Sequence, residues 1–172
     1  AKELAKTALC YKNKIEHVIW REKEATKSVK KLAENPELNA LINKLCKDIT
    51  NQGQQKIVRL EEILNFVAKT SAISIPEKLE ETEAETEIKK LVPKRLFKGT
   101  ISFDILKKAL GEKEYEWYQE IYEKDHQFGT KTAEFINFMD GKRSAYDIVK
   151  AISAEYSETN LEQVLKFLRD LE

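Results

Sequence analysis

Apolar side chains recur every three or four residues through the first 32 positions of the chain, where neither glycine nor proline occurs. Spacing that averages about 3.5 residues is typical of a helix that packs along one seam. It predicts a single helix of about 30 residues, roughly 45 Å long. We call these positions, of which one is charged, the heptad seam: Leu4, Ala8, Tyr11, Ile15, Val18, Glu22, Ala25, Val29 and Leu32.

A tight turn is predicted where this helix ends. Asn35 can accept hydrogen bonds from the free N–H groups of a following helix, and Pro36 needs no partner at the first helical position. A second helix is expected to run back along the first, which gives a long antiparallel helical hairpin over residues 1–72. Its apolar positions are Leu38, Ile42, Leu45, Ile49, Ile57, Leu60, Leu64 and Val67.

Gly53 interrupts the second helix, where a glycine costs about 1 kcal/mol relative to alanine. The hairpin register places Gly53 opposite Val18 and close to Trp20. Two interpretations stay open: Gly53 makes room for the Trp20 indole, or it marks a kink or a short break. The same register keeps Cys10 and Cys46 far apart, so no disulfide is expected, which is consistent with a reducing, cytoplasmic compartment.

Charge divides the chain into three parts. Thirty basic and thirty acidic side chains balance overall, which excludes the protein-wide basic field typical of nucleic-acid binding. Residues 1–72 carry a net charge of +5, residues 73–92 of −3 and residues 93–172 of −2. The middle part is expected to be an acidic linker or a solvated helix starting at Pro76.

Short helices with recognisable caps are predicted in residues 93–172. Ser102 caps a helix over 103–110 that Gly111 ends, and Ser144 caps a helix over 145–156. Further helices are expected over 113–123, over 131–139 and after Thr159, whose hydroxyl forms the last capping box. The fold class is therefore all-α, with a small winged-helix-like (helix-turn-helix) bundle, truncated before the wing, after the hairpin.

No residue pattern indicates catalysis, a cofactor or a metal site, so the expected catalytic, cofactor-binding and metal-binding residues are none. His17 and His126 have no ligand partners at helical spacing. The acidic pairs Glu61-Glu62 and Glu80-Glu81 fit charged surfaces. Tyr115, Tyr118 and Tyr122 lie at helical spacing, as a core face requires.

Binding to nucleic acid is not expected, and neither is a membrane. The exposed positions of the last helix sum to −1, which disfavours a duplex partner. Lys142-Arg143 is the only basic pair near it. No apolar stretch approaches the roughly 20 residues that span a bilayer.

Several segments resemble a known family: Pro93 to Gly99, Asn137 to Ser144, Ser153 to Tyr156 and Val164 to Leu168. They are similar to the C-terminal extension of bacterial and archaeal zinc aminopeptidases of the aminopeptidase Y and leucyl aminopeptidase type. That family holds two zinc ions with His, Asp and Glu residues of an α/β domain, and no such pattern occurs here. The resemblance therefore implies an accessory role, with no site residue carried over.

The sequence thus predicts a non-catalytic accessory or interaction region of a larger cytoplasmic metallo-aminopeptidase. Because the chain lacks an initial Met and stops at Glu172 within an apolar pattern, we expect a longer polypeptide. The alternative is a dimeric helix-turn-helix transcriptional regulator or adaptor. The expected partners are the catalytic domain of the parent protein or a second copy of the chain. They would cover a second apolar set: Leu9, Ile19, Trp20, Leu41, Ile63 and Phe66.

Overall fold

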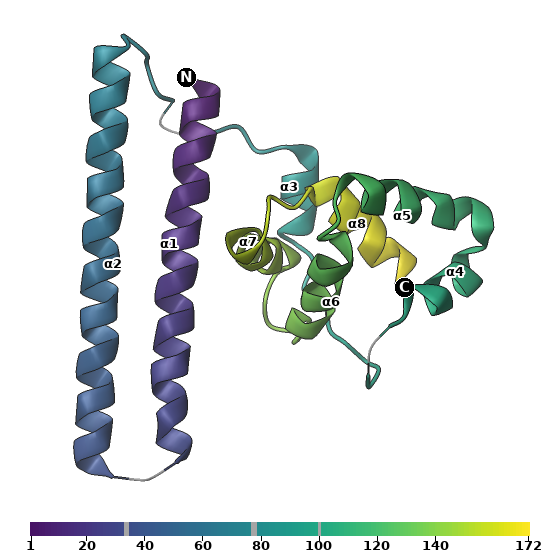
Figure 1. Ribbon diagram of the computed structural model, residues 1–172, viewed down its shortest axis with the longest axis horizontal. Helices are drawn as coiled ribbons and strands as arrows, with labels where there is room; N and C mark the ends of the chain where they lie inside the picture. The colour runs from purple at the N-terminus through teal and green to yellow at the C-terminus, as the bar shows by residue number, and fades with distance from the viewer. Residues whose placement is uncertain (33–34, 77–78, 100) are drawn as a thin grey trace. The chain divides into compact units, whose positions relative to one another are not determined.

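The computed structural model describes residues 1–32, 35–76, 79–99 and 101–172 (Figure 1). Within these residues the protein is all-helical, with eight α-helices and no strands. The chain divides into two units, Ala1–Glu80 and Glu81–Glu172. The division falls inside the acidic stretch at residues 73–92.

The first unit contains two long helices, α1 (Lys2–Ser28) and α2 (Pro36–Thr70). A short 3₁₀ helix over Val29–Lys31 extends α1. Asn35 caps α2 as predicted, because its Oδ1 accepts from the backbone N–H of Glu37 at 2.8 Å and of Leu38 at 3.4 Å.

α1 and α2 lie side by side and run in opposite directions (Figure 1). Lys12 Nζ lies 3.4 Å from Glu61 Oε1, and Cys46 Sγ lies 3.9 Å from the carbonyl oxygen of Lys23. Residue numbers therefore fall along α2 as they rise along α1. Cys10 and Cys46 are both free thiols.

The structure shows neither the expected Trp20 contact nor a break at Gly53. α2 continues unbroken through this residue, so there is no break in the helix. The space beside Gly53 is filled by Ile19, whose Cδ1 and Cγ1 a Cβ at residue 53 would overlap. Trp20, the expected occupant, is 40 % exposed.

The heptad seam faces α2 only in part. Leu4, Ala8 and Ile15 are half-buried, whereas Tyr11 and Val18 are exposed. The half-buried Ile19, which lies outside the seam, fills the space beside Gly53 instead. The contact face of α1 is therefore displaced around the helix from the predicted seam by less than one residue, or about 100°.

The second unit contains six helices: α3 (Glu83–Ile88), α4 (Phe103–Leu110), α5 (Glu112–Lys124), α6 (Phe128–Phe138), α7 (Ala145–Glu155) and α8 (Leu161–Asp170). The helix bounds at α4 are confirmed, with Ser102 Oγ accepting from Ile105 at 3.3 Å and Gly111 at the C-terminal end with φ of 82°. The Ser144 cap of α7 is confirmed as well.

Two helix starts differ from the prediction. α6 begins at Phe128 rather than at residue 131, because Phe128 itself is buried in the core. α8 is capped by Asn160 instead of Thr159, with the Asn160 Oδ1 accepting from Glu162 at 2.9 Å and Gln163 at 3.2 Å.

A single hydrophobic core holds the second unit together. It includes α3, since Ile88 is fully buried, so this part of the acidic stretch is neither a linker nor a solvated helix. The helix also starts at Glu83 rather than at Pro76. The largest side chains that are almost inaccessible to solvent are Tyr118, Phe135, Ile88, Ile148 and Ile152.

The segment between α3 and α4 is tied to the loop between α6 and α7. The N–H of Arg95 donates to Met139 O at 3.0 Å, and the N–H of Ala145 donates to Leu91 O at 2.8 Å. An isolated bridge joins Lys94 and Asp140. This bridge is the only β-type pairing in the described part of the second unit.

Candidate interaction surface

The buried lysine of the second unit, Lys131, is held in place by hydrogen bonds. Lys131 is 3 % exposed. Its Nζ donates to Asp125 Oδ2 at 2.7 Å, to Ser157 Oγ at 2.7 Å and to Glu158 O at 3.2 Å. All three partners are in loops, so the buried ammonium fastens the α5–α6 loop to the α7–α8 loop.

The prediction that the tyrosines of α5 form a core face is correct for Tyr118 and Tyr115 and wrong for Tyr122. Tyr118 is buried, and its hydroxyl donates to Asp170 Oδ2. Burial, together with this carboxylate, raises the pKa of the Tyr118 hydroxyl well above its usual range. Tyr115 stacks on Tyr118 with ring centroids 5.9 Å apart, whereas Tyr122 is exposed.

The basic side chains of α8 are paired with carboxylates. Lys166 Nζ lies 2.8 Å from Asp170 Oδ2, and Arg169 lies 2.7 Å from Glu87 on α3. A helix that reads DNA needs such groups for phosphates and bases. This pairing is consistent with the expectation that α8 does not bind a duplex.

The basic pair Lys142-Arg143 lies in the loop before α7. Asp140 Oδ1 accepts from the backbone N–H groups of Arg143 at 2.9 Å and Lys142 at 2.8 Å. These bonds from Arg143 and Lys142 lower the pKa of the Asp140 carboxyl. Asp140 therefore stabilises the turn of this loop through hydrogen bonds from the backbone.

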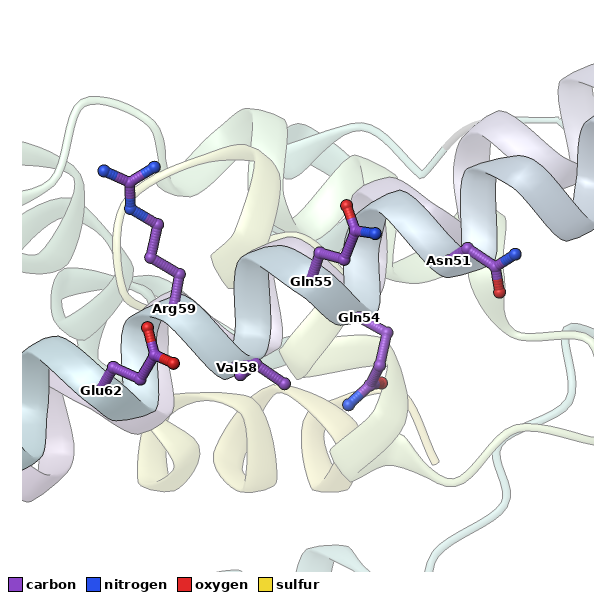
Figure 2. A pocket seen from close by; sticks show the side chains of 6 residues that line it. All are labelled: Asn51, Gln54, Gln55, Val58, Arg59 and Glu62. Carbon is purple, nitrogen blue, oxygen red and sulfur yellow. The ribbon is translucent and has the colours of Figure 1, made fainter.

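No group of three or more metal-ligating side chains occurs among the described residues. The one pocket that stands out there is a polar depression on α2, shown in Figure 2. Every side chain that lines it comes from this single helix: Asn51, Gln54, Gln55, Val58, Arg59 and Glu62. With no second element to close it, the depression cannot enclose a small molecule.

Large apolar side chains are instead exposed on α1 and α2. Six of them, which we call the flank face, are between 43 % and 68 % exposed: Tyr11, Val18, Leu41, Leu45, Ile63 and Phe66. Phe66 is the most exposed of the six. Scattered single apolar residues are normal on a protein surface, whereas a contiguous set is typical of an interaction site.

Helix geometry places the flank face on one side of the α1–α2 pair. Val18 directly precedes the contact residue Ile19, and Leu41 directly precedes the buried Ile42. The other members also precede residues of the contact face, so each lies about 100° around its helix from the partner helix. For two antiparallel helices, this rotation leads to the same side of the pair.

Only part of the second apolar set predicted from the sequence lies on the flank face. Leu41, Ile63 and Phe66 are exposed as expected and belong to the flank face. Leu9 and Trp20 are exposed too, but Trp20 follows the contact residue Ile19 and lies on the opposite side. Ile19 packs against Gly53.

Polar residues occupy the middle of the flank face on α2. Asp48, Gln52, Lys56 and Arg59 precede the contact residues Ile49, Gly53, Ile57 and Leu60, and all four are exposed. The face thus has an apolar patch at each end and charged and amide groups between them. On α1 the corresponding positions are Tyr11, Lys14, Val18 and Glu22.

The described helices include none that is long and apolar enough to cross a membrane. Comparison with protein-family models, with curated proteins and with solved structures finds no match for this chain. The inference about function therefore rests on the flank face.

Proposed function

We propose that this chain is a non-catalytic interaction region, in which the helical hairpin α1–α2 binds another polypeptide through its flank face. The observation that carries the proposal is the exposure of six large apolar side chains on one side of the pair. Covering such side chains contributes about 25 cal/mol for each Å² of apolar surface removed from water.

The second unit has a separate role in this proposal, as an accessory domain. Fifteen of its hydrophobic residues are buried in one cluster, so it has a core of its own. We propose that it is a winged-helix-like bundle that acts as an accessory domain. The resemblance of residues 93–172 to the extension of zinc aminopeptidases makes a larger cytoplasmic peptidase the first parent protein to test.

Photocrosslinking tests the interaction directly. A benzophenone amino acid at Phe66, in the native host, is expected to form adducts with a polypeptide. The matched control is the same amino acid at Asn65, which is exposed and follows the contact residue Leu64, and so lies on the opposite side. Equal yields at the two positions, or no adduct at residue 66, would refute the proposal.

The parent protein is tested by size. An antibody raised against this chain is expected to detect a native band far above 20.0 kDa, whose purified form hydrolyses aminopeptidase substrates in a zinc-dependent manner. A native band at 20.0 kDa would contradict the role as part of a larger peptidase and leave the interaction proposal standing.

A further inference from the structure

The flank face is self-complementary along α2. The point midway between Gly53 and Gln54 lies equally far from Asp48 and Arg59, and equally far from Leu41 and Phe66. Leu45 and Ile63 are also equally far from this point, to within one residue. A two-fold rotation about the point therefore places an acidic residue opposite a basic one and each apolar patch opposite the other.

We propose that the flank face binds a second copy of this chain about a two-fold axis that passes through this midpoint. The inference rests on the proposed function and names its partner. The axis runs perpendicular to α2, so α2 packs antiparallel on α2 of the second copy. Such an interface is isologous, with the same surface used by both copies.

Charge complementarity supports this choice of partner. In the two-fold arrangement Asp48 faces Arg59 of the second copy, and the reverse pair forms as well. Within one chain these residues are separated by 11 positions on a continuous helix, or about 16 Å, too far for an ion pair. Gln52 lies, to within one residue, at the level of Lys56 of the second copy, where its amide oxygen can accept a hydrogen bond from the ammonium.

The same axis also brings the exposed members of the heptad seam, Tyr11 and Val18, onto the surface that faces the second copy. Because Ile19 packs on Gly53, the axis crosses α1 near Val18, which then meets Val18 of the second copy. Tyr11 lies at the level of Ala25 of the second copy. In this arrangement the two hairpins form a four-helix bundle.

The size of the face suits a stable dimer. From Leu41 to Phe66 the face extends about 38 Å, and two neighbouring helices are about 20 Å wide, so each copy contributes roughly 760 Å². Doubling this area reaches the standard interface size of about 1,600 Å².

The test is charge reversal in the full chain, with dimerisation measured by analytical ultracentrifugation over a concentration series. The wild-type chain is expected to dimerise. Asp48→Arg and Arg59→Asp should each weaken dimerisation at least tenfold, because they place like charges together. The double variant Asp48→Arg with Arg59→Asp should recover the wild-type dissociation constant to within about threefold, because it restores both pairs.

A second variant pair addresses the apolar patches. Leu45→Glu should abolish the dimer, while the control Asn43→Glu, at an exposed position that follows Ile42, should leave it intact. Circular dichroism on every variant checks that the helices persist. A monomeric wild-type chain, or a double charge variant no better than the single ones, would overturn the inference.

The crosslinking experiment separates this inference from the proposed function. An adduct at residue 66 with twice the mass of the native polypeptide supports the second copy. An adduct with a different polypeptide overturns the second copy but preserves the interaction role. Absence of any adduct refutes both.

Discussion

The two units differ in where their apolar side chains lie. The second unit, Glu81–Glu172, has fifteen buried hydrophobic residues in one cluster. The first unit, Ala1–Glu80, is nearly as long, yet its buried hydrophobic residues are Ala5, Ile42 and Ile57. Similar stretches of amphipathic helix thus give a closed core in one case and an exposed face in the other.

The difference follows from the number of helices that pack together. Two long helices cover only one strip of each other, so a second apolar strip remains in water. In the second unit, all six short helices contribute buried residues to a common centre. The second unit therefore has a buried core of its own, whereas the first unit leaves much of its apolar surface in water.

The largest expected effect lies in the core of the second unit. Phe135→Ala should lower its free energy of unfolding by about 3–5 kcal/mol, because Phe135 is 2 % exposed and leaves a cavity. Ile57→Ala in the first unit should cost about 2 kcal/mol, since the two helices can shift to fill the space. Urea titration of each variant measures both, and the reverse order would contradict the comparison.

Next in size is the buried ammonium. Lys131→Met should destabilise the second unit by about 2–3 kcal/mol, because it leaves Asp125 and Ser157 without their shared donor. The control Lys124→Met changes an exposed lysine of the same helix pair and should alter stability by less than about 0.5 kcal/mol. Equal losses in the two variants would show that Lys131 has no special role.

A smaller effect is expected at Gly53. Gly53→Ala should cost about 1 kcal/mol, because overlap with Ile19 outweighs the gain in helix propensity. In the Ile19→Ala background the same change should stabilise the first unit by about 1 kcal/mol, since the obstacle is gone. A double-mutant cycle measures this change of sign, and additive effects would mean that the two side chains do not touch.

The smallest effect concerns pH and α3. Desolvation favours a raised pKa for Glu85, but hydrogen bonds from Lys89 and Tyr146 outweigh it, and the net pKa is lowered. A carboxyl whose pKa is lowered on folding contributes stability above its unfolded pKa of about 4.3, and this is lost as the pH falls.

Thermal melts of Glu85→Gln and of wild type should therefore converge as the pH drops from 6 to 3. The first unit should show no such difference between the two proteins. A gap that widens on acidification would contradict the lowered pKa.

Most capping residues are predicted correctly from the sequence, whereas contacts between distant residues are not. Ser102, Gly111, Asn35 and Ser144 act on backbone groups within three residues, so their roles are visible in the sequence itself. The prediction that Thr159 caps α8 is wrong, because Asn160, one position later, accepts from the N–H groups of Glu162 and Gln163. The spacing of capping residues does not decide which of two adjacent candidates forms the cap.

The interaction surface was predictable in part. Leu41, Ile63 and Phe66 were expected to lie uncovered, and they do. Tyr11, Val18 and Leu45 are predicted to lie between the two helices, and all three are exposed. Which of two adjacent strips faces the partner helix depends on the fit of Ile19 against Gly53, and such a fit involves residues far apart in the chain.

The contact between α3 and α8 has a consequence for the order of folding. Glu87 and Arg169 are joined across 82 positions of the chain, so the first helix of the second unit meets the last. During synthesis, Ile88 is not fully enclosed until α8 has been made and packs against α3. Non-local closure of this kind is slow compared with helix formation. A nascent chain halted before Leu161 would expose an open core to chaperones, while α1 and α2 are already formed.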